Sequence, residues 1–185
     1  GTLDPFAEGV LIIGSNKDTK KLTTISSMKK SYEASLQLGC ETDTQDVTGN
    51  IIIRKKIPVF NEIDIKNVFN KFLGQSTQVP PAFSAKKING VRSYKLARQG
   101  KKIEHRSISI TIYSLELLYF DKHSIQFFVE SSKGTYIRVL GQDIARSLNT
   151  AGYLKTLKRT SVGDYSYESS KKISELESEW KYISN

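Results

Sequence analysis

The sequence has 185 residues, with 28 Lys and Arg against 19 Asp and Glu and a formal net charge of +9. This length fits one domain, and the single cysteine, Cys40, excludes an internal disulfide and a zinc site built from several cysteines. The basic balance favours a polyanionic partner, nucleic acid ahead of an anionic membrane, and no stretch approaches the ~20 apolar residues of a membrane span. A lone free thiol is typical of a reducing compartment, so we expect a cytoplasmic location.

Hydrophobic periodicity predicts the elements of the first half of the chain. Apolar residues alternate with polar ones from Tyr32 to Leu38, which predicts a half-buried strand. Apolar residues at helical spacing from Ile65 to Leu73, followed by Gly74, predict a helix and its end. In chain order we expect a strand at 10–13, a helical segment at 18–27, a strand at 32–38, a polar turn at 41–50, a strand at 51–57 and a helix at 64–73.

The second half alternates between strands and helices. Pro80 and Pro81 predict an irregular segment at 78–85, and Ser93 is the expected N-cap of a short helix. The further expected elements are a helix at 93–99, strands at 108–120 and 125–130 joined by a turn, a helix at 135–148, a strand at 154–162 and a terminal helix at 173–180. Strands outnumber helices and are joined mostly by short turns. The expected fold class is therefore α+β, with a mostly antiparallel mixed sheet flanked by helices.

The positive charge gathers in three segments. Eight basic residues between Lys86 and Arg106 stand against one acid, and five lysines between Lys17 and Lys30 stand against one acid. The third group consists of Lys155, Lys158 and Arg159. A solvated face usually mixes both signs, so one-signed clusters favour a phosphate-binding surface over a merely soluble one.

Two segments are unlike ordinary loops. Asp4 precedes Pro5 at a stiff turn that leads into apolar residues, although an Asp before a Pro is most often only a turn former. Arg138 falls in or near the first turn of a predicted helix, where a cation opposes the helix dipole and needs an anionic partner. The sequence contains neither a G-x-x-x-x-G-K-[ST] phosphate loop nor a G-x-G-x-x-G motif.

Together these segments belong to an ordered set of motifs that resembles the TruB family, the bacterial tRNA pseudouridine-55 synthases. The blocks keep the family's order and cover nearly the whole chain. They are Gly1-Thr2-Leu3-Asp4-Pro5 with Ala7-x-Gly9-Val10-Leu11, Lys30-Ser31-Tyr32 with Leu38-Gly39 and Thr42-Asp43-Thr44-x-Asp46-x-x-Gly49, Gln78-Val79-Pro80-Pro81-x-x-Ser84-Ala85-x-Lys87-x-x-Gly90 with Tyr94-x-x-Ala97-Arg98-Gln99-Gly100, Ser132-Lys133-Gly134-Thr135-Tyr136-Ile137-Arg138, and Leu157-Lys158-Arg159.

The resemblance implies a pseudouridine synthase-like core and a set of catalytic residues. By their match to the family, Asp4 is the nucleophile, Arg138 pairs with it, and Tyr32 stacks on the target base and serves in proton removal. Without the motif, Tyr32 is better explained as a core tyrosine on its strand. The residues expected to bind substrate are Leu157, Lys87, Tyr94, Arg98, Lys133, Tyr136 and Arg159. The resemblance implies no metal and no cofactor, and only two histidines, His105 and His123, are available as nitrogen ligands.

The same resemblance implies the partners and the domain boundaries. The expected partner is tRNA, through its T-stem and loop, with no membrane and no obligate protein partner. In the family a strand and a His-containing turn precede Gly-Thr-Leu-Asp, and many members carry a C-terminal PUA-type domain. We therefore expect residues 1–185 to form the catalytic domain without that first strand and without a PUA domain. The alternatives are a catalytically silent RNA-binding or RNA-remodelling module of the same fold, and a relative that acts on ribosomal RNA through a guide complex.

Overall fold

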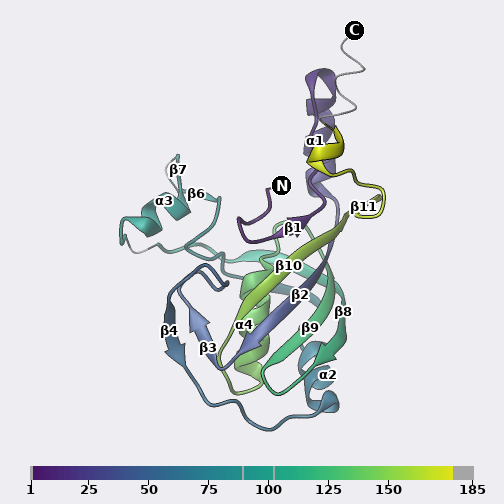
Figure 1. Ribbon diagram of the computed structural model, residues 1–185. Coiled ribbons are helices and arrows are strands. Elements are labelled where there is room, and N and C mark those ends of the chain that lie inside the picture. The colour runs from purple at the N-terminus through teal and green to yellow at the C-terminus, as the bar shows by residue number, and fades with distance from the viewer. Residues whose placement is uncertain (1, 89, 102, 177–185) are drawn as a thin grey trace.

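A seven-stranded mixed sheet forms the centre of the protein, as seen in the computed structural model, which describes residues 2–88, 90–101 and 103–176 (Figure 1). The strands lie in the order β1-β10-β2-β9-β8-β5, and β11 also pairs with β10. The pairing of β1 with β10 is parallel, and the other pairings of this sheet are antiparallel. Their bounds are β1 Glu8–Gly9, β2 Lys30–Leu38, β5 Gly74–Gln78, β8 Ile108–Phe120, β9 Ser124–Ser131, β10 Gly152–Val162 and β11 Tyr165–Ser166. The predicted fold class is confirmed.

Two helices, α2 (Glu62–Asn70) and α4 (Ile137–Ser147), pack against the sheet and close the core. Leu140 and Ile144 of α4 are buried in the same hydrophobic cluster as Leu36 of β2, and α2 adds Phe69, whose ring meets Phe127 of β9 edge-on at 6.0 Å. The alternation that predicted β2 arises because one face of this strand is buried under α4 and the other is more open.

Three smaller parts project from the sheet (Figure 1). One is an arm made of η1 (Asn16–Lys20) and α1 (Lys21–Ser27), in which no residue is buried. The second is a lobe formed by β6 (Lys87–Ile88), β7 (Val91–Arg92) and α3 (Ser93–Arg98). The third is a hairpin of β3 (Cys40–Thr42) and β4 (Ile51–Arg54). No helix within the described ranges is long and apolar enough to cross a membrane.

The strand expected at 10–13 is wrong, because the chain pairs with β10 just before it, at Glu8–Gly9 of β1. Gly9 has φ +107°, and a Cβ there would collide with the backbone of Arg159, so glycine permits the close approach to β10. After Val10, whose N–H donates to the Arg159 carbonyl, the chain leaves the sheet. Leu11 and Ile13 are accordingly 53% and 76% exposed.

Other boundaries differ for local reasons. The strand expected at 51–57 ends at Arg54, and β3 occupies the start of the expected turn at 41–50. The strands β5, β6, β7 and β11 were not predicted. The helix expected at 64–73 begins at Glu62, behind an Asn61–Asp64 capping box, and ends at Asn70. Ser93 is not an N-cap: it is the first residue of α3, and its hydroxyl lies 2.8 Å from the His105 ring.

The remaining predicted elements hold with shifts at their ends. The helix expected at 135–148 is α4, and the strand expected at 154–162 begins two residues earlier, at Gly152. Of the terminal helix expected at 173–180, residues 173–176 are helical, and the rest lies outside the described residues.

Candidate active site

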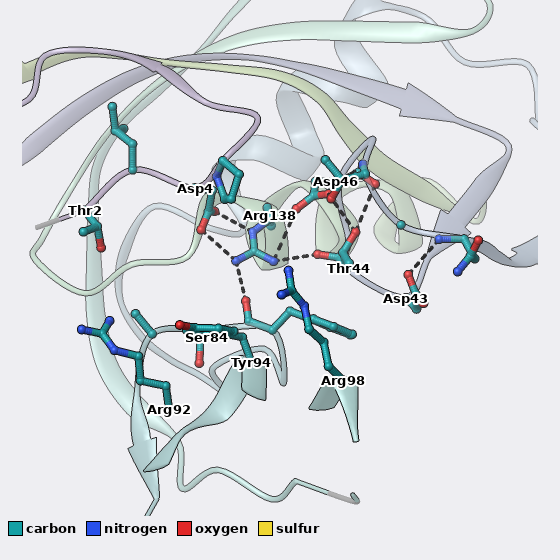
Figure 2. Close-up of a pocket in the computed structure, with 17 residues that line it drawn as sticks. Thr2, Asp4, Asp43, Thr44, Asp46, Ser84, Arg92, Tyr94, Arg98 and Arg138 are labelled. Atoms are coloured by element: carbon teal, nitrogen blue, oxygen red, sulfur yellow. Dashed lines mark hydrogen bonds and ion pairs between the residues drawn. The ribbon is translucent and has the colours of Figure 1, made fainter. Parts of the chain in front are cut away.

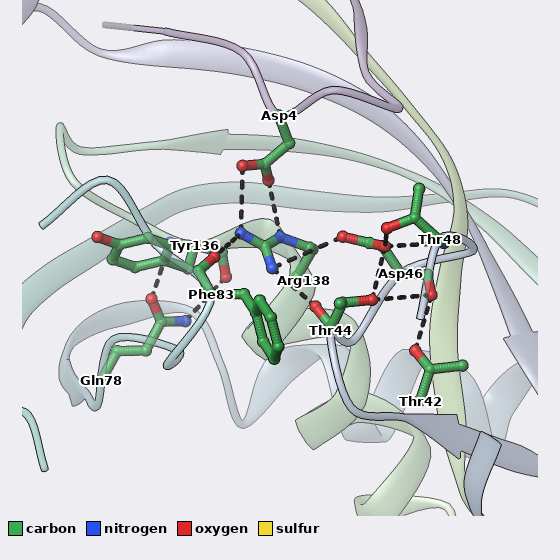
Figure 3. A network of polar contacts seen from close by, with 9 residues as sticks. All are labelled: Asp4, Thr42, Thr44, Asp46, Thr48, Gln78, Phe83, Tyr136 and Arg138. Carbon is green, nitrogen blue, oxygen red and sulfur yellow. Dashed lines mark hydrogen bonds and ion pairs between the residues drawn. The ribbon is translucent and has the colours of Figure 1, made fainter. Parts of the chain in front are cut away.

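Arg138 lies at the centre of a network that joins segments far apart in the sequence (Figure 3). Its Nε donates to Asp4 Oδ2 at 2.7 Å and its Nη2 to Asp4 Oδ1 at 3.1 Å, which makes a bidentate pair. Nη1 donates to the Thr44 carbonyl at 2.7 Å, and Nη2 also donates to the Phe83 carbonyl at 2.9 Å. Asp46 Oδ2 lies 3.6 Å from Nη1. The expected Asp4–Arg138 pair is thus present in the structure.

The position of Arg138 explains why it needs so many oxygen partners. It is the second residue of α4, where a cation opposes the helix dipole, and its side chain is only 3% exposed. A buried guanidinium is tolerated when its donors are satisfied and its charge is compensated. Two carboxylates and two backbone carbonyls do this, so the guanidinium is held in one orientation.

Asp4 is presented on a turn that its own backbone closes. The Ala7 N–H donates to the Asp4 carbonyl at 2.9 Å, and Pro5 restricts the chain between them. The Asp4 side chain is 36% exposed, in contrast to its buried partner. Its carboxylate is therefore oriented by Arg138 yet remains open to a ligand.

The loop between β3 and β4 supplies Thr44 and Asp46 to the site, two motif residues to which the sequence analysis assigned no role. Asp46 Oδ1 accepts from the Thr44 hydroxyl and from both the backbone N–H and the hydroxyl of Thr48, at 2.8, 2.9 and 2.6 Å. The Thr42 hydroxyl donates to the Asp46 carbonyl at 2.7 Å. The alternating Thr and Asp residues were the sequence signal for this local network, since their short polar side chains readily form hydrogen bonds to nearby backbone and side-chain groups.

Two cavities meet at Asp4. The smaller, about 260 Å³, is lined by Asp4 and by four predicted site residues, Tyr32, Tyr136, Leu157 and Arg159. The larger, about 680 Å³, shares Asp4 and adds Arg138 with three residues of the projecting lobe, Arg92, Tyr94 and Arg98 (Figure 2). The smaller cavity thus opens between the N-terminal segment, the sheet and the start of α4, and the larger lies between the Asp4–Arg138 pair and the lobe.

Burial and neighbouring charge set the ionisation of the groups around the smaller cavity. Burial raises the pKa of Tyr32, Asp4 adds to this, and the charge and hydrogen bond of Arg159 oppose it. Tyr32 is therefore a neutral phenol at pH 7. Burial lowers the pKa of Lys30, and the charges of Arg159 and Lys133 lower it further. The Lys30 ammonium donates to two carbonyls at the end of α1, those of Ser26 and Met28.

Comparisons with known proteins identify the family of this chain. Residues 1–137 match the family described as TruB family pseudouridylate synthase (N terminal domain). The chain belongs to the TruB family. Over 176 residues it is 44% identical to the tRNA pseudouridine synthase B of Rickettsia akari, covering 94% of this chain and 59% of that protein. It is 42% identical over 178 residues to the protein of the same name from Aquifex aeolicus, covering 95% of this chain and 62% of that protein. The chain thus spans about three fifths of these relatives.

Solved structures share the fold at lower identity. A chain of a Cbf5-Nop10-Gar1 complex superposes with a TM-score of 0.75 at 23% identity, covering all of this chain and 46% of that one. A chain of an H/ACA RNP bound to a substrate RNA containing 2'-deoxyuridine gives a TM-score of 0.69 at 22% identity, covering all of this chain and 45% of that one. These likenesses concern the fold alone, and they agree with the expected mixed sheet flanked by helices.

Two of the residues predicted to bind substrate line neither cavity. Lys87 is on β6 and Lys133 is in the turn before α4, and both are exposed. The Gln78 side chain fixes the backbone of Tyr136, because it donates to the Tyr136 carbonyl at 3.1 Å and accepts from its N–H at 2.8 Å. The sequence motif contained Gln78, but its position 58 residues upstream concealed this contact.

The three basic segments differ in the burial and ion pairing of their charged side chains. Arg159, expected on a phosphate-binding surface, is 3% exposed, and its Nε donates to the Val10 carbonyl at 2.8 Å. In the arm, Lys21 pairs with Asp18 at 2.8 Å. Lys29, which follows the arm, pairs with Glu130 at 3.0 Å. The segment 86–106, here called the basic lobe, exposes most basic side chains of its described residues and places Arg98 over the Tyr94 ring at 5.7 Å.

The described residues contain no group of three or more His, Cys, Asp or Glu side chains that could hold a metal ion. The carboxylates near Arg138 are instead directed to its guanidinium.

Proposed function

We propose that this protein isomerises uridine to pseudouridine at position 55 of the T-loop of tRNA, and that Asp4 is the nucleophile. The observation that carries the proposal is the bidentate Asp4–Arg138 pair at the junction of two cavities, with Tyr32 and Leu157 on the wall of the smaller one. Membership of the TruB family and the names of the relatives support the choice of tRNA. On this proposal the protein acts in the cytoplasm, with its tRNA, and residues 1–185 form its catalytic domain.

The reaction conserves all atoms of the substrate. The bond from N1 of uracil to C1′ breaks, a bond from C5 to C1′ forms, the C5 proton leaves and N1 gains a proton. A carboxylate such as Asp4 divides this exchange into two easier steps by forming a transient covalent bond. Arg138 holds that carboxylate in place, and Tyr32 offers a ring to stack on the target base and a hydroxyl for the proton removal that the family resemblance assigns to it.

A uridine inside a folded loop has to leave the base stack before it can reach Asp4. Flipping a base costs a few kcal/mol, which contacts with the RNA backbone must offset. The basic lobe stands beside the larger cavity, where phosphates of the stem and loop could be bound. Arg98 over Tyr94 further offers a stacking surface for an exposed base.

The direct test is to incubate unmodified tRNA with the protein and to map pseudouridine by carbodiimide-blocked reverse transcription. We expect one new stop that reports position 55, and none in a tRNA with cytidine at that position. Tight binding without any stop would instead favour the catalytically silent RNA-binding module. A stop at a different uridine would overturn the assignment of position 55.

Charge reversal in the basic lobe tests the RNA surface. Arg98→Glu with Lys101→Glu is expected to weaken tRNA binding and to flatten its salt dependence, by about one unit of slope for each phosphate that the variant no longer neutralises. The measurement is the slope of log affinity against log salt concentration. The matched control reverses Lys66 and Lys71, which lie on and just after α2, away from the lobe (Figure 1). Equal slopes for the two double variants would exclude the basic lobe as the RNA-binding surface.

A further inference from the structure

Helix α4 contacts the segment 41–48, which is the end of β3 and the loop after it, at three successive turns, of which the proposed site uses only the first. Arg138, Gln142 and Arg146 recur every four residues and so lie on one side of the helix. Arg146 donates to both carboxylate oxygens of Glu41, at 2.9 and 2.8 Å. Gln142 donates to Glu41 Oε2 at 2.9 Å and accepts from Gln45 Nε2 at 2.8 Å.

Gln45 is the strained residue of this loop. Its φ is +64°, a left-handed conformation that a residue with a side chain adopts at a cost. It stands between Thr44, whose carbonyl binds Arg138, and Asp46, whose carboxylate lies near the same guanidinium. The Gln45 carbonyl also accepts from the Leu154 N–H at 3.1 Å. Such a conformation persists only when the surrounding structure holds it.

We propose that Gln45, Gln142, Glu41 and Arg146 form a positioning chain that directs the two loop acceptors at Arg138 and so fixes the orientation of Asp4. These residues touch neither cavity wall of the proposed uridine site and act through Arg138. Glu41 is the anchor, because its carboxylate is 4% exposed and is bound by both Gln142 and Arg146. The inference rests on the proposed function, since it assigns a role in that reaction.

The consequence of releasing the chain follows from the acceptors of Arg138. The loop supplies one of its two carbonyl partners and one of its two carboxylate partners. If the loop moves, the guanidinium reorients toward its remaining partners and carries the Asp4 carboxylate with it. A displacement of about 1 Å at a reacting group can lower turnover by about a hundredfold.

The central experiment compares three variants by kcat, KM and hydrogen exchange of the segment 42–50. Gln45→Gly removes the bond to Gln142 without adding strain, because glycine adopts positive φ freely. Arg146→Met removes both bonds to Glu41, and Arg146→Lys keeps the charge but loses the fork geometry. We expect kcat to fall about tenfold in Gln45→Gly and Arg146→Met and less in Arg146→Lys, with KM within about twofold of the parent. Hydrogen exchange of 42–50 is expected to be faster than in the parent in all three variants, and least so in Arg146→Lys.

Ile144→Val is the matched control, since it destabilises the same helix from its core face without touching the loop. We expect it to lower the melting temperature and leave both kcat and the exchange of 42–50 unchanged. If kcat follows the melting temperature across all four variants, the role is structural and the proposal is overturned. If the parent makes no pseudouridine, the proposed function fails, and the exchange data alone decide: unchanged protection of 42–50 in Gln45→Gly and Arg146→Met overturns the positioning chain.

Discussion

Asp4→Asn is expected to reduce pseudouridine formation below about one hundredth of the parent's turnover, a factor worth ~2.7 kcal/mol of barrier. An amide is a far poorer nucleophile than a carboxylate, so the covalent route closes. The amide also presents an N–H2 group toward one of the two guanidinium donors of Arg138, so the bidentate pair is lost. The measurement is a single-turnover assay with enzyme in excess, which excludes product release from the observed rate.

The same variant is expected to bind tRNA with nearly the parent's affinity. Arg138 keeps its carbonyl acceptors on Thr44 and Phe83, and the basic lobe is untouched. Asp121→Asn, in the turn between β8 and β9, is the matched control for the same chemical change away from the site. Turnover by Asp4→Asn above about a hundredth of the parent's would contradict the nucleophile assignment, and equal losses in both variants would indicate a general effect of charge.

How much of the fold was predictable depends on burial. β2 and α4 each have one buried face, and burial imposes the period that the sequence displays. β5 gave no such signal, because Gly74, Gln75, Ser76 and Thr77 are all exposed and the strand is held by its backbone pairing with β8. β1 is two residues long and was placed too late, since the apolar run after Gly9 resembles a strand more than its true pairing segment does.

In the site, the side chains could be predicted from the sequence and the backbone partners could not. Asp4 and Arg138 are 134 residues apart, and no local pattern joins them; the ordered motifs did so. The carbonyls of Thr44 and Phe83 have no side-chain signature, so the sequence could not show that they bind Arg138. The expected exposed basic surface around Arg159 is wrong for a different reason, because counting charges along the chain does not reveal which of them are buried. Its predicted role in binding substrate stays a prediction, and the residue lines the smaller cavity.

Arg138→Lys is expected to lower turnover by about tenfold to a hundredfold while the protein stays folded and binds tRNA normally. Lysine keeps the positive charge between Asp4 and Asp46, but its three donors on one nitrogen cannot reach both oxygens of Asp4 and two carbonyls together. The expected defect therefore lies in kcat, because the carboxylate is still present and has lost its fixed orientation. Steady-state kinetics with tRNA and a thermal melt measure the two sides of this prediction.

Two further variants serve as controls for Arg138→Lys. Arg54→Lys makes the same exchange on β4, away from both cavities, and is expected to retain full turnover. Arg138→Met leaves the buried carboxylate of Asp46 and the Asp4 carboxylate without their shared cation, which is expected to lower the free energy of unfolding by about 3–5 kcal/mol. If Arg138→Lys matched Arg54→Lys in turnover, charge alone would suffice at this position. The bidentate geometry would then play no part in catalysis, because an ammonium supplies the charge without the fork that binds both oxygens of Asp4.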